Sequence, residues 1–267
     1  MSDSFAASLP ERKPGRIAFI SLFMAWSALL AAAIVFGNVS ADGHASWLAT
    51  AARMGSSVVL VVAGWLAYGL WRNSRSGRFA LCIAVGMTFG TIGDLFNAGW
   101  LDFVPLDDPV LGGIIAFALG HVAYITGFVS LAIRAGLTNL RAILGAVLAW
   151  QLVGLVGWYF VAARGTEARA LVWPALPYSL LLAGTAGITS GLARQDRRLL
   201  GPALGGALFL ASDLILAFEL FRGSFAYRTE CVWLTYGPGQ MLIVFSTIIT
   251  PAISRQTTAM NWATSAD

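Results

Sequence analysis

The chain has 267 residues, of which 58% are hydrophobic and only 11% are charged, with a mean hydropathy of +0.75. Soluble domains carry about 25% charged residues, so this composition excludes an ordinary soluble domain and indicates that the bilayer is the solvent. The net charge of +4 comes from arginines in short segments, without the basic-aromatic pattern of a nucleic-acid-binding protein. Cys82 and Cys231 each lie in an apolar stretch, which favours neither a disulfide framework nor a zinc site.

Eight apolar runs follow one another along the chain, each long enough to cross the roughly 30 Å of a bilayer core. We expect membrane-spanning helices at residues 17–36, 47–71, 79–100, 110–133, 142–162, 171–192, 200–221 and 231–253. The predicted fold is therefore an all-α polytopic membrane protein, one eight-helix bundle over residues 17–253 with polar tails at 1–16 and 254–267. The first run exceeds the roughly 7–15 residues of a signal-peptide core, so we expect it to be retained.

Lysine and arginine are unevenly distributed between the two sides of this bundle. Most lie in the N-terminal tail or in the segments that join spans two and three, four and five, and six and seven. By the positive-inside rule these segments and both termini face the cytoplasm, and the acidic turn at 101–109 faces the other side. We therefore expect an integral protein of a bacterial inner membrane with both termini cytoplasmic. Arg53 lies near the outer end of the second span, where it can snorkel to the interface.

Two aspartates, Asp94 and Asp213, lie deep inside predicted spans. A charged carboxylate at bilayer depth costs roughly 2.5–3.5 kcal/mol, so it persists only where it lines a polar cavity, pairs with another group or stays protonated. At about 1.5 Å per residue, further polar side chains lie at a similar depth, about 8–16 Å from the outer end of each span. This layer contains Asp94, His121, Tyr178, Asp213, Tyr236 and Gln240. If these side chains face inward, they form a polar chamber that suits a lipid-sized substrate.

An internal repeat emerges when the chain is shifted by 119 residues, which lays residues 86–95 over 205–214. The shift pairs Gly86 with Gly205, Asp94 with Asp213, Leu95 with Leu214 and His121 with Gln240. Spans one to four and five to eight would then be two parallel four-helix repeats related by an axis along the membrane normal. Such repeats commonly build a site at their interface.

Five motifs occur in order along the predicted spans. They are GD at 93–94, AFALGHVAYITGF at 116–128, PYSLLLAG at 177–184, GALFLASDLILAF at 206–218 and TYGPGQMLI at 235–243. In this order they resemble the YhhN-like lysoplasmalogenase family, over about residues 50–252. Two segments, LFNAGW at 95–100 and Gly-Pro-Gly at 237–239, depart from the family pattern and leave the substrate's head group and chain length open.

The resemblance implies an eight-span enzyme, since some members hydrolyse the vinyl ether of lysoplasmalogens to a fatty aldehyde and a glycerophospho-alcohol without a metal or cofactor. It implies a lyso ether-lipid substrate and membrane lipids as partners, and no nucleic acid. Asp94 and Asp213 would form the catalytic pair. The implied supporting residues are Asn97, His121, Tyr124, Tyr178, Ser212, Tyr236 and Gln240.

The residue types suit this chemistry on their own terms. A vinyl ether hydrolyses by slow proton transfer to its β-carbon, and water then traps the oxocarbenium ion, so the catalyst needs a positioned acid and a nearby anion. Two like charges a few ångströms apart do not both ionise readily, so one carboxyl of a buried pair stays protonated while its ionised partner stabilises the cation and orients water.

Three other functions share some of these features. An intramembrane aspartyl protease also uses two aspartates, but Asp94 lacks the GxGD spacing and Asp213 follows Ser212 where a tyrosine is expected. A retinal protein needs an intramembrane lysine, and the only lysine is Lys13 in the N-terminal tail, which excludes that class. A proton-coupled transporter or lipid-binding membrane protein fits the paired aspartates and the repeat, and this alternative stays open.

The same polar residues also have a structural interpretation. A buried Asp, His or Tyr can hold helices together through hydrogen bonds worth about 1 kcal/mol. Glu219 is expected to face the interface or to pair with Arg222, and Trp233, near the start of the last span, is assigned to the interfacial aromatic belt. No helix face is marked as a dimer seam, so the oligomeric state is not predicted.

Overall fold

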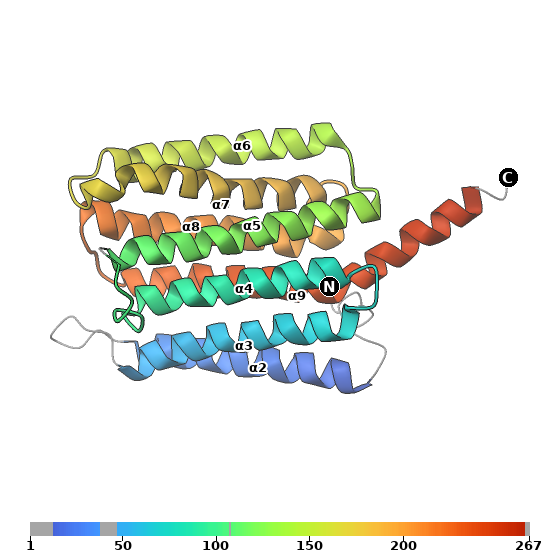
Figure 1. Cartoon of the computed structure of the whole chain (residues 1–267), viewed down its shortest axis with the longest axis horizontal. Coiled ribbons are helices and arrows are strands. Elements are labelled where there is room, and N and C mark those ends of the chain that lie inside the picture. The colour runs from blue at the N-terminus through green and yellow to red at the C-terminus, as the bar shows by residue number, and fades with distance from the viewer. Residues whose placement is uncertain (1–12, 38–46, 107, 265–267) are drawn as a thin grey trace.

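The computed structural model describes residues 13–37, 47–106 and 108–264, and these residues form helices joined by turns and short loops (Figure 1). The long helices are α2 (Lys13–Val35), α3 (Trp47–Trp71), α4 (Gly77–Asn97), α5 (Pro109–Ala135), α6 (Leu140–Trp158), α7 (Val172–Ala193), α8 (Leu200–Arg222) and α9 (Arg228–Thr264). A π-helical turn, Tyr159–Ala163, extends α6, and 3-10 turns at Arg169–Leu171 and Arg197–Leu199 lead into α7 and α8.

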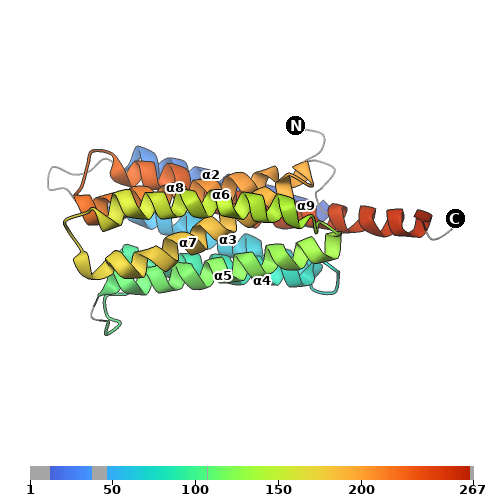
Figure 2. The same cartoon turned by 90° about the horizontal axis from the view of Figure 1, so that it is seen from above.

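Within the described residues, eight helices are long and apolar enough to cross a membrane. They correspond one by one to the predicted spans and run back and forth between the two ends of the bundle (Figures 1 and 2). The chain is therefore an all-helical integral membrane protein, as predicted.

The ends of the helices differ from the predicted spans by a few residues. Helix α4 stops at Asn97 rather than at residue 100, and α9 remains helical to Thr264, beyond the predicted end of the last span at 253. The predicted C-terminal tail thus begins inside a helix. Most of the predicted N-terminal tail, 1–16, lies outside the described residues.

The helices that follow one another in sequence also pack side by side. In each half of the chain, α2 to α5 and α6 to α9, every helix contacts the next. Contacts between α5 and α7 and between α3 and α9 join the two halves. Figure 1 shows α6 at one edge of the bundle and α2 at the other, with α4, α5, α8 and α9 between them. A site built between these central helices therefore receives residues from both halves of the chain.

Two glycine pairs let central helices approach closely. A Cβ added to Gly86 on α4 would lie 3.0 Å from the carbonyl oxygen of Gly120 on α5, beside the Tyr124 ring. A Cβ added to Gly205 on α8 would lie 2.7 Å from the carbonyl oxygen of Gly239 on α9. Real Cβ atoms essentially never come within 3.0 Å of a neighbour, so both crossings depend on glycine.

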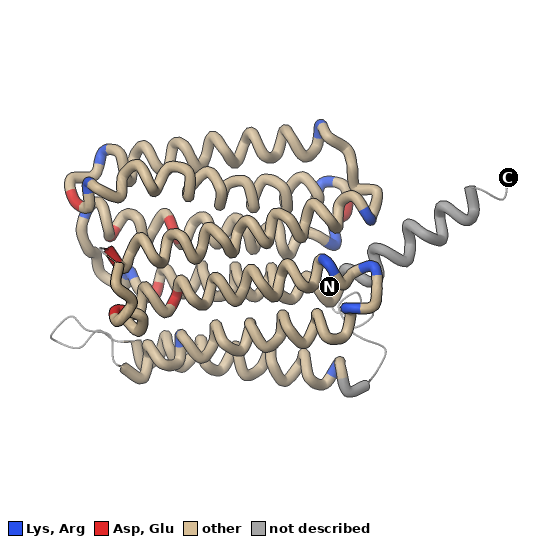
Figure 3. Tube along the Cα trace, viewed as in Figure 1, with Lys and Arg blue, Asp and Glu red and all other residues tan. Residues whose placement is uncertain are grey.

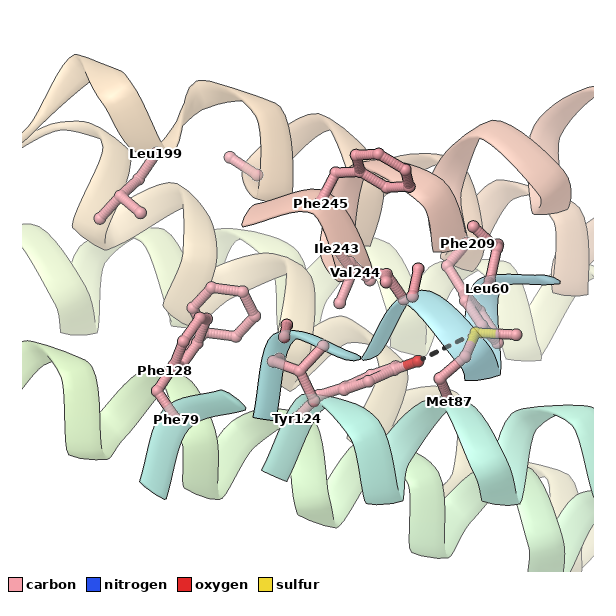
Figure 4. Packing of buried hydrophobic residues seen from close by; sticks show 14 of the residues in the cluster. Leu60, Phe79, Met87, Tyr124, Phe128, Leu199, Phe209, Ile243, Val244 and Phe245 are labelled. Atoms are coloured by element: carbon pink, nitrogen blue, oxygen red, sulfur yellow. Dashed lines mark hydrogen bonds between the residues drawn. The ribbon is translucent and has the colours of Figure 1, made fainter. Parts of the chain in front are cut away.

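Apolar side chains fill the middle of the bundle, and charged residues gather mainly toward its two ends (Figure 3). Figure 4 shows part of this core, including Leu60, Phe209 and Val244 from three different helices. The hydroxyl of Tyr124 also lies in this core, 3.7 Å from the sulfur of Met87 (Figure 4). Polar side chains inside the bundle therefore stand out against hydrocarbon surroundings.

Candidate functional site

A cavity of about 380 Å³ lies at the end of the bundle where α3 and α9 begin and α4 and α8 end. Both Asp94 and Asp213 line it, and we call it the carboxylate cavity. Its other lining residues are Thr50, Arg53, Met54, Asn97, Ala98, Phe117, Leu216, Glu219, Arg228, Thr229, Val232, Trp233 and Tyr236. The two intramembrane aspartates thus reach one cavity from two halves of the chain.

The position of Asp94 depends on how α4 ends. Gly99 adopts a left-handed conformation with φ of +71°, and the backbone N–H groups of Gly99 and Trp100 donate to the carbonyls of Phe96 and Leu95. This is a Schellman arrangement, which satisfies the last carbonyls of a helix. Helix α4 therefore ends about one turn beyond Asp94, and the aspartate lines the cavity from the last turn of the helix.

The Asp94 carboxyl is buried, with 4% of the residue exposed, and it accepts two hydrogen bonds from other helices. The hydroxyls of Ser57 on α3 and Tyr236 on α9 donate to Oδ2 of Asp94 at 2.6 Å and 2.9 Å. No hydrogen bond within the described residues engages Oδ1 of Asp94. The carboxyl is therefore held in place through one oxygen, Oδ2.

A chain of hydrogen bonds continues from Tyr236 into the centre of the bundle. The side-chain amide of Gln240 donates to the Tyr236 hydroxyl at 3.1 Å, and the Tyr124 hydroxyl donates to Oε1 of Gln240 at 2.7 Å. Tyr236 and Gln240 are four residues apart, on one face of α9. Gln240 and Tyr124 do not line the carboxylate cavity; they fix the Tyr236 hydroxyl that touches Asp94.

Asp213 has partners of its own. The Tyr178 hydroxyl on α7 donates to Oδ2 of Asp213, and the Ser212 hydroxyl lies 3.2 Å from Oδ1 while also bonding to the Phe209 carbonyl oxygen. Asp213 and Tyr178 also line a second, mostly apolar pocket of about 50 Å³ beside Trp158. Asp213 thus lines both the carboxylate cavity and this mostly apolar pocket.

His121 is separated from this arrangement. Its Nδ1 lies 2.8 Å from the Thr185 hydroxyl, and its ring stands edge-on against Phe209 at a centroid distance of 4.3 Å. Its Nε2 has no hydrogen-bond partner among the described residues. The polar layer predicted from equal depth does not form one chamber. Asp94, Asp213 and Tyr236 line the carboxylate cavity together with the exposed Asn97, whereas His121, Tyr178 and Gln240 do not.

The structure corrects three expectations about individual residues. Arg53 does not snorkel outward: it is 4% exposed and lines the cavity, with a guanidinium nitrogen 4.0 Å from Glu230. Glu219 pairs directly with Arg228, not with Arg222. Trp233 does not belong to an exposed belt, because it is 8% exposed and packs edge-on against Tyr236.

Ser57 and Thr185 are polar partners that the sequence analysis missed. Serine and threonine are common in membrane helices, where they bond to their own backbone, so nothing in the sequence separates these two from the rest. For Ser57 a usable signal is its spacing of four residues from Arg53, which puts both side chains on one face of α3. In the part of the chain that is described, no three His, Cys, Asp or Glu side chains gather in a way that could hold a metal ion.

These features define a class: an integral membrane protein of eight helices in which two aspartates from different halves of the chain meet at one cavity. The chain belongs to the YhhN family, which matches residues 48–247, so the family predicted from the motifs is confirmed. It is 26% identical to lysoplasmalogenase TMEM86B of Homo sapiens over 210 residues, covering 79% of this chain and 80% of the relative. It is 30% identical to lysoplasmalogenase TMEM86A of Bos taurus over 179 residues, covering 62% and 65%. No solved structure matches the chain.

Proposed function

We propose that the protein is an integral membrane hydrolase that cleaves the vinyl ether of a lysoplasmalogen, or of a related lyso ether lipid, without a metal or cofactor. The products are a fatty aldehyde and a glycerophospho-alcohol. The observation that carries the proposal is that Asp94 and Asp213 line one cavity. Membership of the YhhN family and the likeness to two lysoplasmalogenases support the same reaction.

The reaction uses one carboxyl as an acid and the other as an anion. The acid transfers its proton to the β-carbon of the vinyl ether, and the double-bond electrons form the new C–H bond. The ether oxygen shares the resulting positive charge, which the ionised carboxyl stabilises. Water adds to the cationic carbon and gives up a proton to the carboxyl pair. The hemiacetal then breaks its bond to the glycerol oxygen, which takes up a proton as the aldehyde forms.

The hydrogen bonds support Asp94 as the acid and Asp213 as the anion. Two hydroxyls already donate to Oδ2 of Asp94, so a proton on this carboxyl belongs on Oδ1. Oδ2 of Asp213 accepts a hydrogen bond from Tyr178, and Oδ1 lies 3.2 Å from the Ser212 hydroxyl, whose single proton it shares with the Phe209 carbonyl oxygen; these donors suit a carboxylate. Infrared difference spectroscopy tests this assignment: the band of a protonated carboxyl should disappear in Asp94→Asn and persist in Asp213→Asn, and the reverse pattern would exchange the two roles.

The two pockets suggest how the substrate lies. The larger cavity carries the charged side chains and suits the glycerol and head group, whereas the small pocket beside Trp158 is mostly apolar and suits the start of the hydrocarbon chain. Asp213 lines both. A vinyl ether, which joins the polar and apolar parts of a lysoplasmalogen, would then lie at the carboxyl pair.

The test is aldehyde release by the purified protein from a 1-alkenyl lysophospholipid, with the saturated 1-alkyl analogue as control. In D₂O the aldehyde should carry one deuterium on the carbon next to the carbonyl, because the proton on that carbon comes from the acid. The saturated ether should release nothing, since it has no double bond whose electrons can accept the proton. Binding of both lipids without aldehyde release would instead favour the transporter or lipid-binding alternative.

We also propose that α2–α5 and α6–α9 are two parallel four-helix repeats. The 119-residue shift that pairs Asp94 with Asp213 also carries the glycine pair Gly86 and Gly120 onto Gly205 and Gly239. In each pair the backbone of one glycine lies so close to the carbonyl oxygen of the other that a Cβ would not fit without a shift. These matched crossings support the repeat, with the cavity lying where the two halves meet.

A further inference from the structure

Arg53 is a buried cation of the carboxylate cavity that lacks a close ion pair among the described residues. The side chain comes from the second turn of α3, is 4% exposed, and lines the cavity. Among the described residues its ion-pair partner is Glu230, at 4.0 Å, and its Nε has no hydrogen-bond partner there. The other cavity arginine, Arg228, is in direct contact with Glu219. A buried cation is costly without a close anion, so Arg53 is placed for an anion that enters the cavity.

The position of Arg53 relative to the carboxyl pair is set by α3. Arg53 and Ser57 are four residues apart, so their side chains leave the helix on the same face with about 5–6 Å between Cβ atoms. The Ser57 hydroxyl bonds to Asp94 at 2.6 Å. Arg53 therefore lies about one helical turn from the contact with Asp94, on the side toward the start of α3. In a lysophospholipid a short glycerol unit separates the phosphate from the chain linkage, a spacing of this order.

From this geometry we infer that Arg53 binds the phosphate of the lipid substrate and makes the site selective for lysophospholipids over phosphate-free glycerol ethers. The inference rests on the proposed function for the identity of the lipid. The planar guanidinium donates two parallel hydrogen bonds to phosphate oxygens, a geometry that lysine cannot reproduce. Its Nε is a buried donor without a hydrogen-bond partner in the part of the chain that the structure describes.

The experiment measures binding of two lipids that the proposed reaction cannot cleave. One is a 1-O-alkyl glycerophosphoethanolamine, and the other is the 1-O-alkylglycerol of the same chain length. The intact protein should bind the phosphorylated lipid more tightly. Arg53→Gln should weaken that binding roughly 10-fold to 100-fold, as expected for loss of hydrogen bonds to a charged group, and should leave alkylglycerol binding unchanged. Arg164→Gln, an exposed arginine that does not line the cavity, should change neither.

Several results would overturn the inference. The first is equal affinity of the intact protein for the two lipids, and the second is unchanged binding of the phosphorylated lipid by Arg53→Gln. The third is an equal loss of affinity for both lipids in Arg53→Gln, which would make Arg53 a structural residue. Inorganic phosphate that binds as tightly as the lysolipid would instead assign the site to free phosphate. If Arg53→Gln does not fold, the double variant Arg53→Gln with Glu230→Gln removes both charges and serves in its place.

The binding test also separates this inference from the proposed function. Because neither lipid is cleaved, an Arg53-dependent preference for the phosphorylated lipid would stand even if the protein released no aldehyde. Conversely, aldehyde release with no such preference would retain the hydrolase and reject Arg53 as its phosphate ligand.

Discussion

At the scale of single residues, only two side-chain hydroxyls among the described residues hold the Asp94 carboxyl in place. Ser57 and Tyr236 donate to the same oxygen of Asp94 from two different helices, and Gln240 and Tyr124 in turn fix the Tyr236 hydroxyl. All five residues are buried. In a medium of low dielectric constant such hydrogen bonds are strong and their loss is expensive. The rate of catalysis should therefore fall when one of these supporting residues is changed, as well as when an aspartate is changed.

Replacing Tyr236 by phenylalanine tests this dependence. The change removes one hydroxyl and keeps the ring that packs against Trp233 and Phe209. A hydrogen bond to a charged or ionisable group contributes about 1.5–3 kcal/mol, so kcat should fall roughly 10-fold to 150-fold. Tyr68→Phe on α3, outside the cavity, should leave kcat unchanged. A Tyr236→Phe protein as fast as the unaltered protein would remove Tyr236 from the mechanism.

The sequence predicted the aspartates but not their surroundings, for a physical reason. A carboxyl inside an apolar run is costly, so Asp94 and Asp213 stand out in any sequence analysis. Depth along a helix follows from counting residues, but the direction of a side chain depends on helix rotation, which packing sets. His121 was placed in the polar layer by depth, but it contacts Thr185 and Phe209 and does not line the cavity. Arg53 was assigned to the surface because it lies near a helix end.

At the scale of helices, length and hydropathy were enough to predict all eight spans, because each must cross the bilayer with its backbone bonds satisfied internally. Helix ends were less accurate, since local capping decides them. Gly99, which closes α4 after Asn97, is an example. The sequence analysis did not predict which helices pack side by side.

Alanine substitutions test the two glycine crossings. Gly86→Ala and Gly205→Ala each place a Cβ within about 3 Å of the facing backbone, or of the Tyr124 ring for Gly86, so the helices must move apart. Overpacking of this kind typically costs about 1–3 kcal/mol in the free energy of unfolding. Gly69→Ala on α3, where a Cβ would meet nothing within 4 Å, is the matched control. Thermal unfolding in detergent measures all three; equal melting temperatures for the three variants would contradict tight crossings at Gly86 and Gly205.

At the scale of the whole molecule, the orientation in the membrane remains a prediction from charge. The lysines and arginines of the N-terminal tail and of three connecting segments favour both termini in the cytoplasm. The carboxylate cavity, at the end where α4 and α8 finish, would then open away from the cytoplasm. A fluorescent reporter fused after Asp267 should be active inside the cell, and a phosphatase inserted near Arg164 should be active outside. The opposite pattern would invert the orientation and turn the cavity toward the cytoplasm.

The most direct test of the central claim, that Asp94 and Asp213 act as one catalytic unit, is the rate of aldehyde release by four proteins. These are the unaltered protein, Asp94→Asn, Asp213→Asn and the double variant, each shown to be folded by its retained binding of a 1-O-alkyl lysophospholipid. Each single change should lower the rate roughly 10²-fold to 10⁴-fold, the range for loss of a general acid or base. The double variant should be little slower than either single one, because the residues share one step. Near-native turnover in both single variants, or losses that multiply in the double variant, would contradict the account.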